Sequence, residues 1–291
     1  MSGPYWSDTF NPIVGCTECS PGCANCWARQ MHERFHETPF GDVRCLPEVL
    51  AKPLRRRKPT TYFVCNTSDL FHPSVPFDFI AAVYGVMAAC PQHTFLTCTK
   101  RPERRAEFMR ILDALVSTHK NTDPHLPIHR ATHCWTEASF YIDFSRHETY
   151  PGYGSTWPLP NVWEGATVED QERADERLAF PADWISAEPL LGPIDLTDSV
   201  GTRQVIIGGE SGPNARPCDV AWIRDIVRQC KEAGVKCFVK QLGSHPAWGR
   251  FGDTSDPSWA RRFGGIYSRA GSDPSEWPED LRVRELGWAA W

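Results

Sequence analysis

A pattern repeated along the chain limits the fold more than any other feature of the sequence. Each copy has a short apolar, strand-like run that ends in a cluster of polar residues, and most copies continue into an amphipathic helix. The runs span residues 62–65, 93–98, 161–168, 183–186, 204–207 and 236–239. Buried strands that alternate with helices are typical of a parallel sheet. Ile13 and Val14 are a candidate for a further, first strand.

The clearest helix of the chain is expected just before the last strand. Asp219 can cap its start, an apolar stripe runs over residues 222–230, and Gly234 can end it. Further helices are expected over about residues 78–89, from near residue 102, and up to about residue 179.

This pattern predicts an α/β fold, namely a partial or complete (β/α) barrel of one domain over residues 1–291. The length of 291 residues is normal for a single barrel of this kind. A doubly wound open sheet is the alternative, because the pattern does not give the strand order. Residues 118–160 break the rhythm and are interpreted as an insertion, a lid or substrate loop, and residues 245–291 as a C-terminal extension.

Four cysteines lie within eleven residues near the N-terminus: Cys16, Cys19, Cys23 and Cys26. The last three form C-x3-C-x2-C, the spacing with which radical S-adenosylmethionine (SAM) enzymes hold a [4Fe-4S] cluster. Cys16, Cys23 and Cys26 form a looser C-x6-C-x2-C. Either set leaves one iron open to a chelating molecule such as SAM. A zinc ion held by all four thiolates and a redox-active C-x-x-C pair are the alternatives.

Charge and hydropathy exclude several classes of protein. A formal net charge of -5 argues against a broad, sequence-independent grip on nucleic acid, and the basic run at residues 55–58 is interpreted as a solvated loop. The sequence lacks an apolar stretch of membrane-spanning length and a secretory signal, so we expect no membrane span. We therefore expect a cytoplasmic chain whose cysteines are reduced.

Polar side chains stand where the predicted strands end, which is where functional groups gather in parallel α/β sheets. They are Asn66, Ser68, Asp69, Lys100, Arg101, Glu169, Glu188, Glu210, Ser211, Lys240 and Gln241. Each could instead cap a helix or form a loop salt bridge. Gly208 and Gly209 would let a ligand approach the main chain closely, and Arg216 could pair with a carboxylate or phosphate.

Seven sequence blocks, in this order, resemble the phage-associated three-cysteine-motif family: TFNPIVGCTECSPGCANCWARQM, NTSDLFH, TCTKRPER, NVWEGATVED, SAEPLLGPIDL, IIGGESGPNARP and FVKQLGS. The resemblance covers nearly the whole chain except residues 118–160 and the C-terminal tail. That family is similar to a distant branch of the radical SAM superfamily, which implies a barrel with an N-terminal cluster loop. It also implies that Cys16, Cys23 and Cys26 are the cluster ligands, with Cys19 as an alternate ligand.

We therefore predict a radical SAM enzyme that binds a [4Fe-4S] cluster and SAM, receives an electron from a donor, and generates a 5′-deoxyadenosyl radical. Its predicted cofactor-binding residues are Asn66, Ser68, Asp69, Gly208, Gly209, Glu210 and Ser211. The predicted catalytic residues are Lys100, Glu188 and Lys240, and the predicted substrate-binding residues are Arg101, Glu169, Arg216 and Gln241. The phage association suggests DNA, a nucleobase or a nucleotide as substrate. A non-catalytic zinc or cluster module and a nucleic-acid-binding protein without chemistry are the alternatives, and the sequence does not indicate an oligomeric state.

Overall fold

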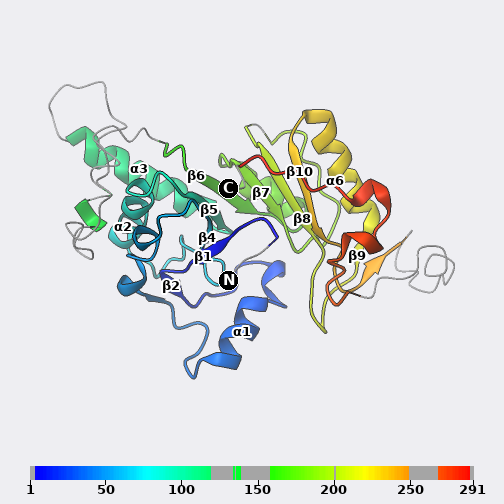
Figure 1. Cartoon of the computed structure of the whole chain (residues 1–291), viewed down its shortest axis with the longest axis horizontal. Helices are drawn as coiled ribbons and strands as arrows, with labels where there is room; N and C mark the ends of the chain where they lie inside the picture. The colour runs from blue at the N-terminus through cyan, green and yellow to red at the C-terminus, as the bar shows by residue number, and fades with distance from the viewer. Residues whose placement is uncertain are drawn as a thin grey trace. The chain divides into compact units, whose positions relative to one another are not determined.

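The structure is a computed structural model that describes residues 4–118, 134, 136–138, 158–199, 201–248 and 268–288. It has a mixed α/β fold built on a seven-stranded sheet (Figure 1). The strands follow one another across the sheet in the order β1-β4-β5-β6-β7-β8-β10. The pairings of β1 with β4, β4 with β5, β6 with β7, β7 with β8 and β8 with β10 are all parallel.

The strand order decides between the two folds that the sequence pattern left open. In a doubly wound sheet the order reverses at a switch point. Here each strand of the sheet instead lies beside the strand that precedes it along the chain, which is the order of a (β/α) barrel. The prediction of an α/β fold with a parallel sheet is therefore confirmed, and β1 and β10 are the first and last strands of this order.

Six of the seven strands lie where the apolar runs predicted them. They are β4 (Thr61–Val64), β5 (Thr94–Thr99), β6 (Val162–Thr167), β7 (Trp184–Ala187), β8 (Gln204–Gly208) and β10 (Lys236–Gln241). The first strand of the sheet is β1 (Asp8–Phe10), so the candidate at Ile13 and Val14 was wrong. Those two residues form β2 (Ile13–Val14), which pairs antiparallel with β3 (Arg44–Cys45). Pro12 separates β1 from β2 because it has no backbone N–H to donate to a ladder.

The chain forms two compact units. Unit 1 comprises Met1–Thr17, Ala28–Glu164 and Ala290–Trp291, and unit 2 comprises Glu18–Trp27 and Gly165–Ala289. Strand β6 gives its first half to unit 1 and its second half to unit 2. A short parallel pair, β9 (Cys218–Asp219) and β11 (Pro246–Ala247), also belongs to unit 2.

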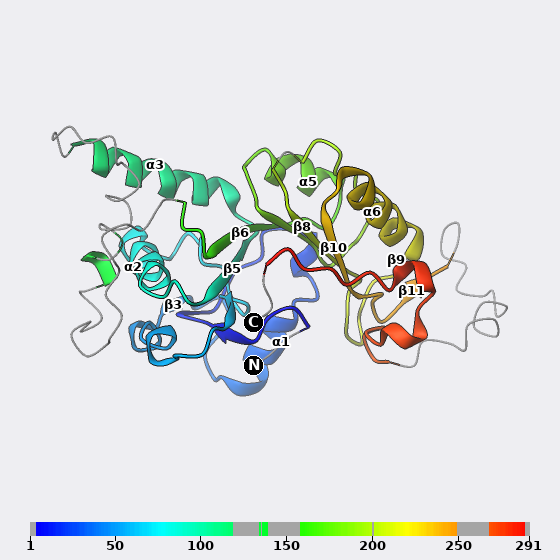
Figure 2. The same ribbon diagram turned by 45° about the horizontal axis from the view of Figure 1, so that its top comes forward.

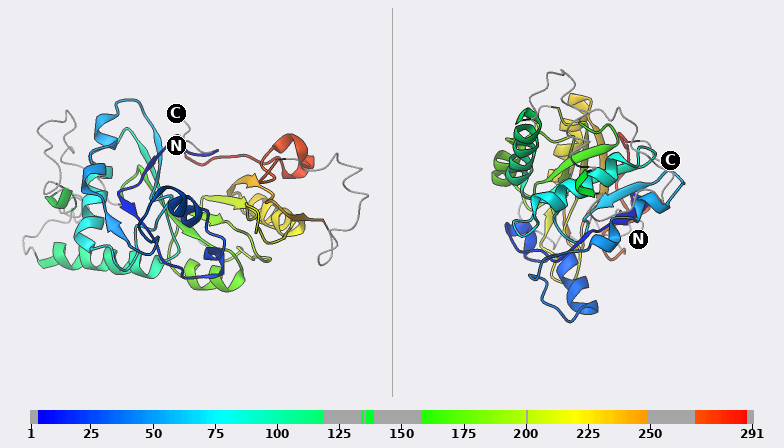
Figure 3. Two further views of the ribbon diagram at one scale, coloured as in Figure 1. Left: turned by 90° about the horizontal axis from the view of Figure 1, so that it is seen from below. Right: turned by 90° about the vertical axis from the view of Figure 1, so that its left-hand side faces the viewer.

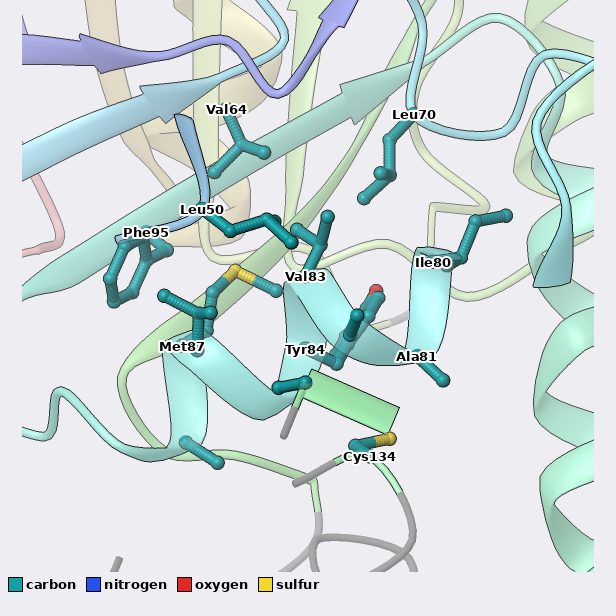
Figure 4. Close-up of a cluster of buried hydrophobic side chains, with 14 of the residues drawn as sticks. Leu50, Val64, Leu70, Ile80, Ala81, Val83, Tyr84, Met87, Phe95 and Cys134 are labelled. Carbon is teal, nitrogen blue, oxygen red and sulfur yellow. The ribbon is translucent and has the colours of Figure 1, made fainter. Parts of the chain in front are cut away.

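The core of unit 1 lies between β4, β5 and the helices α2 (Phe77–Ala88) and α3 (Pro102–Thr118). Figure 4 shows Val83 and Met87 of α2 directed at Val64 and Phe95 of the two strands. Cys134, one of the few described residues between 119 and 157, is buried in the same core. The lid predicted at residues 118–160 otherwise lies outside the described residues.

The core of unit 2 lies between its strands and the helices α5 (Gln171–Leu178) and α6 (Val220–Ala233). Helix α6 lies along β8 and β10 (Figures 2 and 3) and buries Ile223 and Ile226. The predicted caps are confirmed: the Asp219 side chain accepts from the backbone N–H of Ala221 at 2.9 Å, and Gly234 adopts a left-handed φ of 69°.

The remaining elements are short. Helix α1 (Trp27–Phe35) follows Cys26 directly. The described residues also form 3-10 turns at Pro21–Cys23, Pro47–Val49, Pro53–Arg55, Pro274–Glu276 and Glu279–Leu281. The described part of the predicted C-terminal extension packs on unit 2: Trp277 and Leu281 enter its core, and Val283 O accepts from Val239 N at 2.8 Å. No helix in the described part of the chain is both long and apolar enough to cross a membrane.

Candidate functional site

The cysteine run is divided between the two units. Cys16 belongs to unit 1, and Cys19, Cys23 and Cys26 belong to unit 2, in the segment of residues 18–27 that we call the cysteine loop. Cys19 is exposed and the other three are half-buried, and none of the cysteines in the described residues forms a disulfide. No three Cys, His, Asp or Glu side chains of the described residues are gathered closely enough to hold a metal ion.

In unit 1, a buried ion pair joins the residues that follow β4 and β5. Arg101 Nη1 lies 3.0 Å from Asp69 Oδ2. Asp69 also accepts from Thr99 Oγ1 at 2.7 Å and from the backbone N–H of Lys100 at 3.2 Å. A buried carboxylate must be paired and hydrogen-bonded, and these donors meet that need. The two charged residues predicted here from the sequence therefore bind each other.

The same arginine holds the chain at the first cysteine. Arg101 Nη2 donates to Thr17 O at 2.9 Å, and Nη1 lies 3.8 Å from Cys16 Sγ. His72 contacts Thr17 from the other side, with Nε2 2.8 Å from the threonine hydroxyl. His72 Nδ1 accepts from Ser74 N, so in the neutral ring the proton is on Nε2 and is donated to Thr17. Burial and the charge of Arg101 lower the pKa of His72, which favours that neutral ring.

The turn after β4 holds the stretch that leads to Cys16. Ser68 Oγ donates to Ile13 O at 3.0 Å, and the backbone N–H of Asn66 donates to Asn11 Oδ1 at 3.1 Å. Both predicted cofactor-binding residues thus contact the chain's own N-terminal segment.

In unit 2, a second buried ion pair holds the cysteine loop at the end of β6. Glu169 is fully buried, and its Oε2 lies 2.7 Å from Nη1 of Arg177 on α5. Glu169 Oε1 accepts from the backbone N–H of Gly22 at 3.2 Å. Arg177 also donates to Thr167 O at 2.7 Å. Glu169, a predicted substrate-binding residue, is therefore placed under the cysteine loop and bound to it.

A third ion pair holds the same loop at the end of β8. Arg216 contacts Glu210 through Nη2 at 2.6 Å and through Nε at 3.0 Å. Asn25, which stands between Cys23 and Cys26, donates its amide to Glu210 Oε2 at 2.9 Å. Burial raises the pKa of Glu210, but the hydrogen bonds from Arg216 and Asn25 outweigh it and hold the pKa below its usual 4.5.

The ends of β7 and β10 carry a further pair, Glu188 and Lys240, whose carboxylate and ammonium are in contact. The two glycines after β8 are packed closely. A Cβ on Gly208 would lie 3.1 Å from Glu188 Oε1, and one on Gly209 would lie 2.8 Å from the carbonyl carbon of Leu242. Gln241 donates to Gly209 O at 2.8 Å. The space that these glycines leave is therefore filled by the chain itself.

Comparison with known proteins places the chain in a family. The family described as "Protein of unknown function (DUF5131)" matches residues 3–267. The chain belongs to this family. Comparisons of the DUF5131 chain with curated proteins and with solved structures gave no match.

The geometry gives this DUF5131 protein one consistent feature. In unit 1 the residues after β4 and β5 hold Cys16 and Thr17, and in unit 2 the residues after β6 and β8 hold the cysteine loop. The C-terminal ends of parallel strands are where ligands bind in α/β sheets. Within each unit, the cysteine-bearing segment is therefore held at the C-terminal ends of that unit's strands.

Sequence reasoning missed several residues of this arrangement: Thr17, Asn25, His72 and Arg177. The sequence did indicate a role for Asn25, since an amide side chain between two cysteines could be expected to fix their loop. The sequence did not indicate a role for Arg177, because a charged residue on an amphipathic helix usually faces solvent. Lys100 contributes its backbone N–H to Asp69, and Ser211 is half-buried beside Glu210.

Proposed function

We propose that this protein is a radical SAM-type enzyme in which Cys16, Cys23 and Cys26 bind three irons of a [4Fe-4S] cluster and SAM binds the fourth. One observation carries the proposal: a cysteine-rich segment is held by ion pairs whose carboxylates are buried, at the C-terminal ends of parallel strands. The spacing of the cysteines and the resemblance to a branch of the radical SAM superfamily point the same way. A structural zinc ion could also use these cysteines, but it would not explain why they are held at the C-terminal ends of the strands.

The chemistry of the donor set fits an iron–sulfur cluster. Such clusters are bound by cysteine thiolates, and none of the four cysteines is used in a disulfide. The fit is therefore one of ligand type and not of geometry, since no three of the described thiols are gathered into one group. Cys16 is favoured over Cys19 as the third ligand, because Arg101 places a positive charge beside its sulfur whereas Cys19 is exposed.

When bound, the cluster and SAM supply one-electron chemistry: an electron from a low-potential donor cleaves SAM into methionine and a 5′-deoxyadenosyl radical, which takes a hydrogen atom from the substrate. The chain's own residues orient the substrate and exclude water. Glu188 and Lys240 are suited to contact a polar substrate, because they place charges of both signs at the ends of β7 and β10 and remain partly exposed. A nucleic acid, nucleobase or nucleotide is the proposed substrate class, supported by the resemblance to phage-associated proteins.

Anaerobic reconstitution with iron and sulfide tests the proposal. The wild-type protein should bind about four irons per chain, show a thiolate-to-iron absorbance that dithionite bleaches, and convert SAM to methionine and 5′-deoxyadenosine. Cys16→Ser, Cys23→Ser and Cys26→Ser should each lose the iron, whereas Cys19→Ser should keep it. Cys45→Ser, which changes a half-buried cysteine of β3, is the matched control.

Two outcomes would reject the proposal. A colourless protein that holds one zinc through the same cysteines would make the site structural. Salt-dependent DNA binding that survives Cys23→Ala and Cys26→Ala, in a protein that cleaves no SAM, would indicate a nucleic-acid-binding protein without chemistry.

A further inference from the structure

Asn25 uses both hydrogens of its side-chain amide within unit 2. Nδ2 lies 2.9 Å from Glu210 Oε2 and 2.8 Å from Asn214 O. An amide NH2 has two donors, so this group is fully engaged. Because Asn25 stands two residues after Cys23 and directly before Cys26, these bonds fix the part of the cysteine loop that carries both thiols.

The carboxylate that receives Asn25 is held by further hydrogen bonds from Arg216. Glu210 is 5% exposed and accepts four hydrogen bonds: from Arg216 Nη2 at 2.6 Å, Arg216 Nε at 3.0 Å, Arg216 N at 2.8 Å and Asn25 Nδ2. Three of these bonds reach Oε2, and the one from Arg216 Nη2 reaches Oε1. Oε2, which receives Asn25, is therefore fully used within the chain, and Arg216 holds both carboxylate oxygens in place.

The backbone around this carboxylate is held as well. Ser244 N donates to Glu210 O at 2.8 Å, and Gly212 N donates to the Ser244 hydroxyl at 3.0 Å. His245 Nδ1 donates to Ala215 O at 2.6 Å. Asn25 therefore binds to a fixed structure and not to a mobile side chain.

We infer that Asn25, Glu210 and Arg216 form a latch that positions Cys23 and Cys26, with Glu210 as a positioning residue. Glu169 holds Gly22, three residues earlier, so the loop is fixed at two points. The inference rests on the proposed function in that the cysteine loop is the proposed cluster loop. The holding of the loop can nevertheless be measured in the protein without a cluster.

Alkylation of the apoprotein tests the latch. The rates at which iodoacetamide modifies Cys23 and Cys26 are measured by peptide mass spectrometry, with half-buried Cys45 as an internal reference. Asn25→Asp keeps the side-chain shape but puts a carboxylate against Glu210, and it should raise both rates about tenfold or more, because a hydrogen bond to a charged group is lost. Asn25→Ala should act in the same direction, and Cys45 should not change.

A double variant separates the latch from general loss of structure. Asn25→Asp combined with Glu210→Gln removes the repulsion between the two carboxylates. It does not restore every bond, because the amide nitrogen of the glutamine would face Arg216 N and Nε and Asn214 O would lose its donor. The alkylation rates should therefore fall below those of Asn25→Asp alone without reaching those of the wild type. Glu232→Gln removes a carboxylate from the exposed face of α6 and is the matched control, which should leave the rates unchanged.

The outcomes distinguish this inference from the proposed function. If the wild type takes up no iron but Asn25→Asp accelerates alkylation, the latch stands and the cluster proposal fails. If the wild type binds the cluster and the Asn25 variants, folded by circular dichroism, alkylate at the wild-type rate, the latch is overturned. Should Glu210→Gln fail to fold, Asn25→Ala decides alone, because it leaves the Glu210–Arg216 pair intact.

Discussion

Replacing Arg177 by methionine should destabilise the protein far more than an ordinary loss of a salt bridge. The side chain of Arg177 is 5% exposed and that of Glu169 is fully buried. The variant keeps a long side chain but leaves a carboxylate inside the protein without its cation. Glu169 would retain Gly22 N as a donor, which does not neutralise its charge.

The expected magnitude follows from this burial. Removing one partner of a buried ion pair costs roughly 3–5 kcal/mol, because the remaining charge is uncompensated. The same change at Arg228 should leave the free energy of unfolding nearly unchanged, because Arg228 and Glu232 are 57% and 62% exposed and water screens their attraction. Adding Glu169→Gln to Arg177→Met should recover much of the loss, because glutamine removes the buried charge and keeps an oxygen for Gly22 N.

Urea denaturation followed by tryptophan fluorescence measures these differences as changes in the free energy of unfolding. Arg228→Met is the matched control on α6. If Arg177→Met and Arg228→Met lower the free energy of unfolding equally, or if the double variant is less stable than Arg177→Met alone, the assignment of a buried, loop-holding ion pair is refuted.

Two further predictions concern the end of β8. The pKa of Glu210 is lower in the folded protein than its usual 4.5, so its contribution to stability is present above about pH 4.5 and is lost as the pH falls through the folded value. The urea midpoints of the wild type and Glu210→Gln should therefore differ most at pH 7, and the difference should shrink as the pH falls below 4.5. A difference that grows on acidification would contradict this prediction. Gly209→Ala should cost about 1–3 kcal/mol or more, since the new Cβ collides with the Leu242 backbone. Gly41→Ala, with nothing within 4 Å of the added Cβ, is its control, and equal thermal midpoints of the two variants would exclude the collision.

Most of the sheet could be predicted from the sequence because its strands are apolar runs with polar ends. Strand β1 could not, because it has three residues and Asn11-Pro12 follows it directly. Helix α1 was missed for another reason. Its buried residues are Ala28 and His32, while Trp27 and Phe35 are exposed, so the apolar pattern marks the wrong face.

The candidate site was predictable only in part. The charged residues at the strand ends were found, because polar residues that follow a buried strand stand out. Their partners could not be found, since Glu169 binds Gly22 across 147 positions and Glu210 binds Asn25 across 185. A strand-end carboxylate was expected to face a ligand. No local pattern indicates that it binds a distant loop of the same chain instead.

The use of buried charge to hold the cysteine loop has a physical reason that bears on function. Ordering a loop costs roughly 1–2 kcal/mol per residue in backbone entropy, and residues 18–27 have little regular structure beyond one 3-10 turn. A metal group that had to order this loop by itself would lose much of its binding free energy. In the folded chain, Glu169 and Glu210 hold the loop through Gly22 and Asn25. Buried carboxylates are expensive to place and add little net stability, so their presence here is better explained by presentation of the thiols than by stabilisation of the fold.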